Sequence, residues 1–265
     1  MDVIGLLRDG ELTVDARLVA ASNVTLLGEV TQADERLRCV YKPVAGERPL
    51  WDFPDGSLAG REVAAYELSE AAGWHVVPPT VLRRDGPFGP GMCQAWIDQT
   101  GADELVRVVD PAAVPGGWLP IIDALDAGGA PVVVVHADDP GLRRLALFDA
   151  VINNADRKGG HVLRGDSQLG ESMAATVGVD HGVSFHTDHK LRTVLWGWAG
   201  EQLTPVESVE LSRLTVALAG PLGGRLNSLL TDAELQATVE RVDVLRADGA
   251  MPSPRGRMPV PWPVF

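Results

Sequence analysis

Several features that mark common protein classes are missing from this sequence of 265 residues. It has only two cysteines, Cys39 and Cys93, and no CxxC pair, which argues against a disulfide-stapled extracellular domain and favours a reducing compartment. No run approaches the roughly 20 apolar residues that a membrane-spanning helix needs, and the N-terminus lacks the pattern of a signal peptide. We therefore expect a cytoplasmic globular protein with no stable membrane association.

Positive charge and glycine-rich phosphate sites are scarce as well. The chain has 23 Lys and Arg against 36 Asp and Glu, which gives a net charge of -13 at pH 7. A field of this sign repels nucleic acids and anionic membranes, so we expect no nucleic-acid partner. No Walker A sequence and no GxGxxG motif occurs, which argues against the P-loop and dinucleotide-binding classes. Hydrophobic residues make up 45% of the chain, enough for a substantial core.

The N-terminal part of the chain has the pattern of a small α+β lobe. The run from Leu58 to Ala72 has helical spacing, and Gly73 supplies its stop. Six apolar runs bounded by turn residues predict strands of an antiparallel sheet: 3–7, 11–14, 23–30, 37–43, and a hairpin formed by 76–82 and 91–97. We therefore expect an N-lobe at residues 1–95, built from this sheet and one helix.

From Trp118 onwards the pattern changes towards helices. Residues 140–155 carry apolar side chains at helical spacing, and Asp139 can serve as the N-cap. The other predicted elements are a short strand pair at 161–165 and 176–182, helices near 206–218 and 231–245, and an extended arm over the last fifteen residues. We therefore expect a second, mainly helical C-lobe at residues 96–265.

The stretch from Phe148 to Phe185 is the most informative for function. Asp156 and Asp180 lie 24 positions apart beside short apolar runs, and His161 follows Asp156 by five residues. Metal-assisted phosphoryl transfer needs one carboxylate to orient the attacking hydroxyl, and a second carboxylate with another ligand to hold the metal on the phosphates. An Asp-Arg dipeptide alone usually ends a helix, and an Asp-x-Gly alone usually forms a turn. The combined pattern favours an ATP-using kinase.

Lys42 is a candidate phosphate ligand. Lysine is rarely placed in an apolar strand such as RCVYKPV unless it is paired, and Glu62 on the following helix is a suitable partner. A solvent-facing Lys42 and a surface Glu62 are the alternative. Ser22 and Asn23 open a turn between two predicted strands and can offer hydrogen-bond donors to phosphates.

Gln94 and Trp96 are candidates for the adenine site. They end a predicted strand just before the helical lobe, where backbone groups can pair with adenine and the Trp96 ring can form a flat apolar wall. Core packing is the alternative explanation for Trp96.

Five segments, taken in order, resemble a known family. They are VYKP, REVAAYELSEAAGWHVVPPTVL, MCQAWID, NNADRKGGHVL and VDHGVSFH. They resemble the actinobacterial family of phosphatidylinositol 3-/4-kinase-like proteins, within the protein-kinase-like superfamily that also contains type II phosphatidylinositol 4-kinases and HipA-type kinases. The resemblance extends from about Ser22 to Trp262. It implies an α+β, bilobal protein-kinase-like fold with a small β-rich N-lobe, a larger mainly helical C-lobe, and ATP between them.

The resemblance also assigns roles by motif. It implies Asp156 as the catalytic acid, Asp180 as a metal ligand, and an ATP site formed by Ser22, Asn23, Lys42, Glu62, Gln94 and Trp96. Related kinases carry Asn where this chain has His161. Because imidazole suits borderline ions better than Mg²⁺, His161 would shift the preference of the site towards Mn²⁺.

These observations lead to one preferred function and two alternatives. We expect an ATP-dependent kinase, assisted by Mn²⁺ or Mg²⁺, whose acceptor is a hydroxyl of a protein or of a small polar or inositol-type molecule. A pseudokinase that binds nucleotide in a regulatory role is the second hypothesis. A metal-dependent hydrolase built on histidines is the third, although no HExxH spacing supports it.

Overall fold

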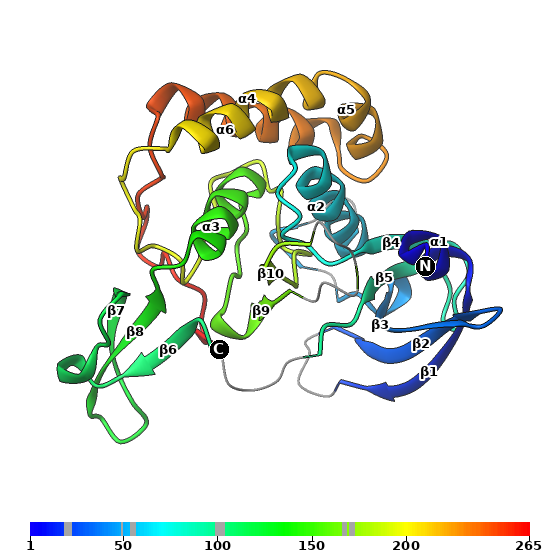
Figure 1. The fold of residues 1–265 in the computed structure, drawn as a ribbon, viewed down its shortest axis with the longest axis horizontal. Helices are drawn as coiled ribbons and strands as arrows, with labels where there is room; N and C mark the ends of the chain where they lie inside the picture. The colour runs from blue at the N-terminus through cyan, green and yellow to red at the C-terminus, as the bar shows by residue number, and fades with distance from the viewer. Residues whose placement is uncertain (19–22, 49, 54–56, 99–103, 166–168, 170–172) are drawn as a thin grey trace.

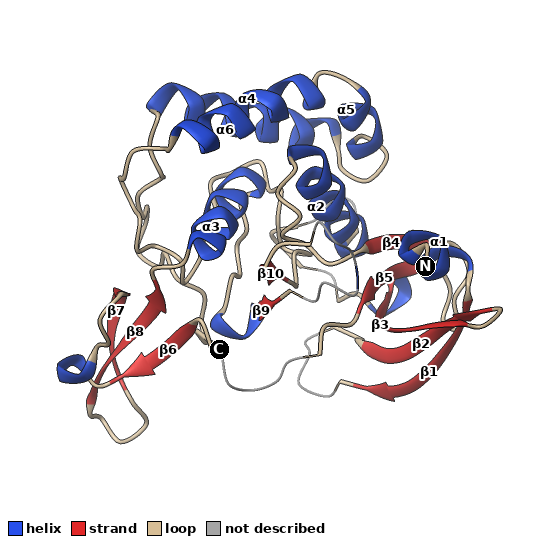
Figure 2. Cartoon of the chain, in the orientation of Figure 1, coloured by secondary structure: helices blue, strands red, loops and turns tan. Residues whose placement is uncertain are grey.

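The computed structural model describes residues 1–18, 23–48, 50–53, 57–98, 104–165, 169 and 173–265. Figure 1 shows a sheet-rich region at the N-terminal end of the chain and a helical region towards the C-terminal end, with helix α2 between them. Figure 2 shows the same division by secondary structure, with a separate small sheet beside the helical region.

The N-terminal region is a five-stranded antiparallel sheet in the order β1-β2-β3-β5-β4. Its strands are β1 (Glu11–Arg17), β2 (Leu26–Gln32), β3 (Glu35–Pro43), β4 (Thr80–Arg83) and β5 (Gly91–Ala95). In β3, Cys39 and Tyr41 are fully buried in the sheet's core. Because successive strand residues point to opposite faces, Val40 and Lys42 lie on the other face. The predicted sheet is confirmed for these five strands.

The predicted strand at residues 3–7 is wrong. These residues belong to helix α1 (Val3–Asp9), and the Asp2 side chain caps it by accepting the N–H of Gly5. Leu6 and Leu7 are buried and pack into the sheet's core. Periodicity cannot separate a short apolar run in a strand from one in a helix, so the N-cap was the decisive signal.

Helix α2 (Leu58–Ala72) forms where the helical spacing predicts it. The Ser57 hydroxyl caps its N-terminus, and Gly73, with φ of 72°, ends it in the left-handed conformation that glycine adopts without steric cost. The helix is buried on most sides, and its Ala64 and Leu68 belong to the main core of the helical region. Helix α2 therefore packs against both regions of the molecule.

The helical region confirms the predicted elements after residue 139 and adds one short helix, at Pro221–Leu226, that the sequence did not predict. Its elements are α3 (Pro140–Ile152), α4 (Pro205–Leu218), α5 (Pro221–Leu226), α6 (Asp232–Asp248), and the antiparallel pair β9 (Val162–Arg164) and β10 (Thr176–Gly178). Asp139 caps α3 by accepting the N–H of Leu142, and Thr231 with Glu234 forms a capping box at α6. Within the described residues, no helix is both long and apolar enough to cross a membrane.

The helical pattern expected from Trp118 is wrong for the first twenty residues. Instead, β6 (Val106–Val109), β7 (Trp118–Leu125) and β8 (Pro131–Ala137) form an antiparallel sheet in the order β6-β8-β7. Asp126 accepts the N–H of Gly129 in the turn between β7 and β8. The β-branched run in β8 and this turn favour a hairpin over a helix.

Candidate active site

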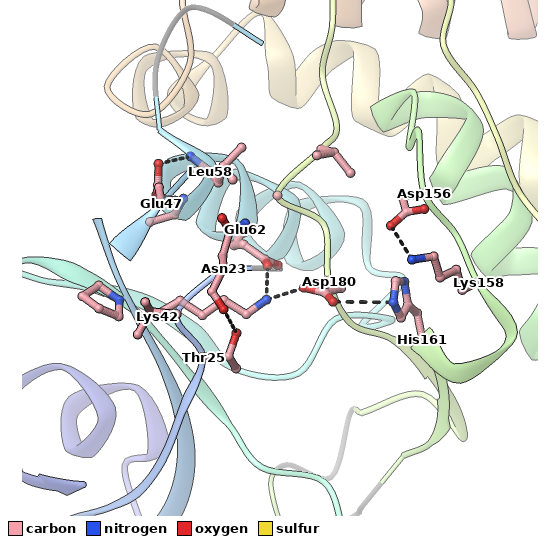
Figure 3. Close-up of a pocket in the computed structure, with 15 residues that line it drawn as sticks. Asn23, Thr25, Lys42, Glu47, Leu58, Glu62, Asp156, Lys158, His161 and Asp180 are labelled. Atoms are coloured by element: carbon pink, nitrogen blue, oxygen red, sulfur yellow. Dashed lines mark hydrogen bonds and ion pairs between the residues drawn. The ribbon is translucent and has the colours of Figure 1, made fainter. Parts of the chain in front are cut away.

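Lys42 lies where β3 faces helix α2, and its charge is fully paired. Its ammonium is 2.7 Å from Oε1 of Glu62 and also contacts Oδ1 of Asp180. Figure 3 shows the three side chains converging from the sheet, from α2 and from the segment after β10. The predicted pairing of Lys42 with Glu62 is therefore present in the structure, and Asp180 joins it.

The electrostatic state of this group follows from its contacts. Burial lowers the pKa of Lys42, but the carboxylates of Asp180 and Glu62 outweigh burial and raise this pKa above its ordinary value. The Lys42 ammonium in turn lowers the pKa of Asp180 well below its usual range. Lys42 and Asp180 are thus charged at neutral pH, and their opposite charges stabilise each other.

Asp180 is held in position through the backbone. Its φ of 64° is in the left-handed region, which Asp tolerates better than most residues, and this turns the chain sharply after β10. The next residue, His181, donates its backbone N–H to Oε2 of Glu62 at 2.8 Å. Glu62 therefore orients both Lys42 and the segment that carries Asp180.

Asp156 follows α3, in a loop fixed by backbone hydrogen bonds. Asn153 ends the helix with φ of 54°, and the side chain of Asn154 accepts the N–H of Asp156 at 3.0 Å. The Asp156 carboxylate lies 3.2 Å from the Lys158 ammonium. Burial raises the pKa of Asp156 above its ordinary value, although Lys158 opposes this effect. A carboxylate of this kind is a better proton acceptor than an exposed one.

Arg157 connects the two loops of the site. It is fully buried and makes a two-pronged ion pair with Asp149 of α3, with distances of 2.8 Å and 2.9 Å. Its other contacts are with the carbonyls of His161 at 3.2 Å and Val179 at 2.8 Å, and with Nε2 of His181 at 2.7 Å. One guanidinium therefore fixes the backbone at His161 and the backbone just before Asp180.

His161 faces Asp180 across a short gap. Its Nε2 lies 3.5 Å from Oδ2 of Asp180, while its buried Nδ1 has no hydrogen-bond partner in the described structure. Burial lowers the pKa of His161 to about 4, because the nearby Asp180 carboxylate only partly offsets the loss of hydration. The imidazole is therefore neutral at pH 7, which is the form that binds metals.

The pair formed by His161 and Asp180 fits a divalent ion bound together with phosphates. Two ligand atoms at about 2.1 Å from an octahedral ion lie about 3 Å apart, close to the observed gap. Among the described residues, no group of three or more His, Cys, Asp and Glu side chains could hold a metal ion. Two side chains with phosphate oxygens and water are the usual arrangement for Mg²⁺ on a nucleotide.

Two adjoining cavities lie between the sheet and the helical region. The first, of about 180 Å³, is lined by polar side chains that include Asn23, Lys42, Glu62, Asp156, His161 and Asp180. The second, of about 420 Å³, shares Lys42 and Asp180 with it and is more apolar; its other lining residues include Val40, Gln94, Trp96, Ile97, Leu163 and Val179. All the predicted site residues within the described chain therefore line one of two connected cavities. Ser22 lies outside the described residues.

Local contacts refine the roles of three predicted residues. The Gln94 amide donates to the hydroxyl of Thr80, and the backbone N–H of Trp96 donates to the carbonyl of Arg38 at 3.0 Å. Both residues line the apolar cavity. The side-chain N–H of Gln94 and the backbone N–H of Trp96 are, however, already hydrogen-bonded to other residues of the protein. The Asn23 side chain accepts the N–H of Arg48 at 2.9 Å, so it orders the loop at the polar cavity.

Glu47 is a residue of the polar cavity that sequence reasoning missed. Its carboxylate accepts the N–H groups of Leu58 at 3.0 Å and Ala59 at 2.8 Å, and so caps the start of α2 (Figure 3). Its distance of eleven residues from Leu58 matches no capping motif, so the sequence carried no signal for this contact. Lys158, also missed as a site residue, had such a signal, because it follows Asp156 by two positions.

A relative that aligns with the whole chain shows which family the chain belongs to. Protein Rv2133c of Mycobacterium tuberculosis is 47% identical over 279 aligned positions, which cover 100% of this chain and 96% of the relative. The chain belongs to the family of Rv2133c. No protein-family model matches the chain.

Comparison with solved structures shows the fold of this chain. The chain is similar to the Golgi casein kinase, with a TM-score of 0.53, 13% identity, and coverage of 93% of this chain and 75% of that one. Against the Golgi casein kinase with Mn/ADP bound, the TM-score is 0.56 at 13% identity, with coverage of 93% and 74%. The predicted α+β, two-lobed, protein-kinase-like fold is therefore confirmed.

Proposed function

We propose that this protein is an atypical ATP-dependent kinase that transfers the γ-phosphate to a hydroxyl group. The observation that carries the proposal is the convergence of Lys42, Glu62, Asp156 and Asp180 around one polar cavity, beside a larger apolar one. Phosphoryl transfer needs a cation for the phosphates, an anion for their metal, and a carboxylate near the acceptor. The likeness to a kinase solved with Mn/ADP supports a nucleotide with a divalent ion as the ligand.

The polar cavity would hold the triphosphate. Lys42, oriented by Glu62, would bind the α- and β-phosphates. The proposed phosphate loop contains Asn23 and also Ser22, which is outside the described residues. Asp180 and His161 would hold Mn²⁺ or Mg²⁺ against the phosphates. A divalent ion held by these residues would neutralise part of the negative charge of the phosphates.

The apolar cavity would hold adenine. It lies beside the end of β5, and Gln94 and Trp96 form part of its wall. With this assignment, residues 1–95 form the N-lobe that carries Lys42, and residues 96–265 form the C-lobe with the catalytic loop, the metal-binding segment and the extended C-terminal arm. The two lobes close on the nucleotide from opposite sides.

Asp156 would act on the acceptor. Its raised pKa suits a group that orients a hydroxyl and accepts its proton as the oxygen attacks the γ-phosphorus. The acceptor would be a protein hydroxyl or a small polar or inositol-type molecule, the latter in keeping with the resemblance to phosphatidylinositol 3-/4-kinase-like proteins. We place the reaction in the cytoplasm.

Nucleotide binding and phosphate transfer in three variants test this proposal. Asp156→Asn should still be stabilised against heat by Mn²⁺-ADP but should lose transfer from labelled ATP by about 100- to 10,000-fold. Lys42→Met should lose the stabilisation by nucleotide. Asp123→Asn, an exposed position in β7, is the matched control and should behave as wild type.

The outcomes separate the hypotheses. Stabilisation by nucleotide without any product, with cell extract as the source of acceptor, would identify a pseudokinase. Full transfer by Asp156→Asn would refute the role of Asp156. Indifference of the wild type to adenine nucleotides at every divalent-ion concentration would refute nucleotide binding altogether.

A further inference from the structure

The segment 259–265 lies against both loops of the site. The carbonyl of Pro259 accepts the backbone N–H of Thr193 at 3.0 Å and the indole N–H of Trp196 at 2.9 Å. Five residues later, the carbonyl of Val264 accepts the N–H of Gly159 at 2.8 Å. Figure 1 shows the C-terminal end of the chain beside the turn that leads into β9. The segment therefore joins the loop after Asp156 to the loop after Asp180.

The ring of Phe265 occupies the space that a side chain at Gly159 would need. A Cβ atom placed on Gly159 would lie 2.3 Å from Cε1 of that ring. This is about 1.2–1.7 Å shorter than an ordinary contact between carbon atoms. Gly159 is not among the glycines with positive φ, so backbone conformation does not demand glycine there. A Cβ on the adjacent Gly160 would meet nothing within 4 Å.

The contact at Gly159 is close to the reacting groups. Gly159 follows Lys158, whose ammonium lies 3.2 Å from the Asp156 carboxylate. The catalytic loop also pairs with the segment that follows Asp180 in the sequence, because Arg157 and Thr193 form an isolated parallel β-bridge. Val260 is buried in the main core at 8% exposure, which anchors the segment, whereas Phe265 is 49% exposed. The Phe265 ring therefore adds little to the core, and its close contact is with the loop.

We propose that residues 259–265 position the catalytic loop, with Val264 and Phe265 as positioning residues that hold Gly159. They act through Lys158 and the loop backbone on the direction of the Asp156 carboxylate. This inference rests on the proposed kinase function, since it assigns a role to Asp156. The segment is thus part of the site, although it lies about 100 positions from the catalytic loop in the sequence.

A double-mutant cycle tests the inference. Gly159→Ala should lower kcat by about 100-fold with little change in KM for ATP, because a displacement of about 1 Å near the reacting groups costs about that much. Phe265→Ala should lower kcat by less. The double variant should match Phe265→Ala, since the added methyl group then has space. Gly116→Ala, in an exposed turn where a Cβ atom would also meet nothing within 4 Å, is the control and should keep wild-type kcat.

Three results would overturn the inference. They are losses in kcat that multiply in the double variant, equal kcat for Gly159→Ala and the control Gly116→Ala, and a fall in the melting temperature of Gly159→Ala without a change in kcat. Hydrogen exchange at the Gly159 amide provides a readout that does not need activity. Exchange should be slow in wild type and faster in Phe265→Ala, and equal rates would contradict the docking. If the wild type transfers no phosphate, the kinase proposal fails, and with it the role in positioning, while the exchange rates still decide whether the segment docks.

Discussion

Arg157 is the residue whose replacement we expect to reduce stability most clearly. Its side chain and that of Asp149 are both fully buried, and the two form a two-pronged ion pair. In Arg157→Met, Asp149 would keep the amide of Asn154 as a partner at 3.0 Å but would lose its counter-charge. Removal of one partner of a buried pair costs about 3–5 kcal/mol, because the remaining charge is uncompensated.

This loss converts into a measurable change in melting temperature. An unfolding entropy of about 2.1 cal/mol/K per residue gives about 0.56 kcal/mol/K for this chain. The expected decrease in Tm is therefore about 5–9 °C, measured by calorimetry without added nucleotide. Arg192→Met is the matched control, since Arg192 is exposed in the neighbouring loop, and it should change Tm by less than about 1 °C.

A second variant separates the ion pair from the other contacts of Arg157. In Arg157→Met/Asp149→Asn the buried charge of Asp149 is removed as well, so part of the lost Tm should return. The recovery should be incomplete, because the carbonyls of His161 and Val179 still lack their donor. A decrease no larger than that of Arg192→Met, or a double variant that melts at least as low as the single one, would refute the reasoning.

The remaining predictions concern the metal and the pH dependence. His161→Asn should increase the rate of transfer with Mg²⁺ relative to the rate with Mn²⁺, because an amide oxygen replaces the imidazole. The exposed control His189→Asn should leave this ratio unchanged. An unchanged ratio in His161→Asn would contradict His161 as a metal ligand. The Lys158 ammonium lowers the pKa of Asp156, so Lys158→Met should raise this pKa. Since only the ionised carboxylate accepts a proton, kcat should then decline at a higher pH on acidification than in wild type, and a profile that stays in place or moves to lower pH would argue against Asp156 as the base.

Local signals explain which elements could be predicted from the sequence. Helices α2, α3 and α6 carry caps beside their periodic runs, at Ser57, Asp139 and Thr231, and each formed within a few residues of its expected place. The apolar runs at residues 3–7 and in β7 and β8 are too short for periodicity to assign, so only the cap at Asp2 and the turn between the two strands distinguish helix from strand there.

Some residues of the candidate site could likewise be predicted from the sequence, and others could not. Lys42, Glu62, Asp156 and Asp180 stand out because charged residues are unusual next to apolar runs. Glu47 and Arg157 could not be assigned in the same way, because their partners are backbone groups and a carboxylate that only the folded chain brings near. Long-range contacts of this kind leave no periodic mark in the sequence.

Helix α2 has a mechanical consequence for the molecule. Two consecutive residues reach to opposite sides, Arg61 to Glu234 of α6 and Glu62 to Lys42 of β3. A displacement of α6 would therefore be transmitted to Lys42 through the neighbouring residues Arg61 and Glu62. Although α6 lies far from the five-stranded sheet, these two ion pairs couple it to the residues of the polar cavity (Figure 1). A fusion on the exposed side of α6 that displaces this helix should therefore also displace the side chains of the cavity.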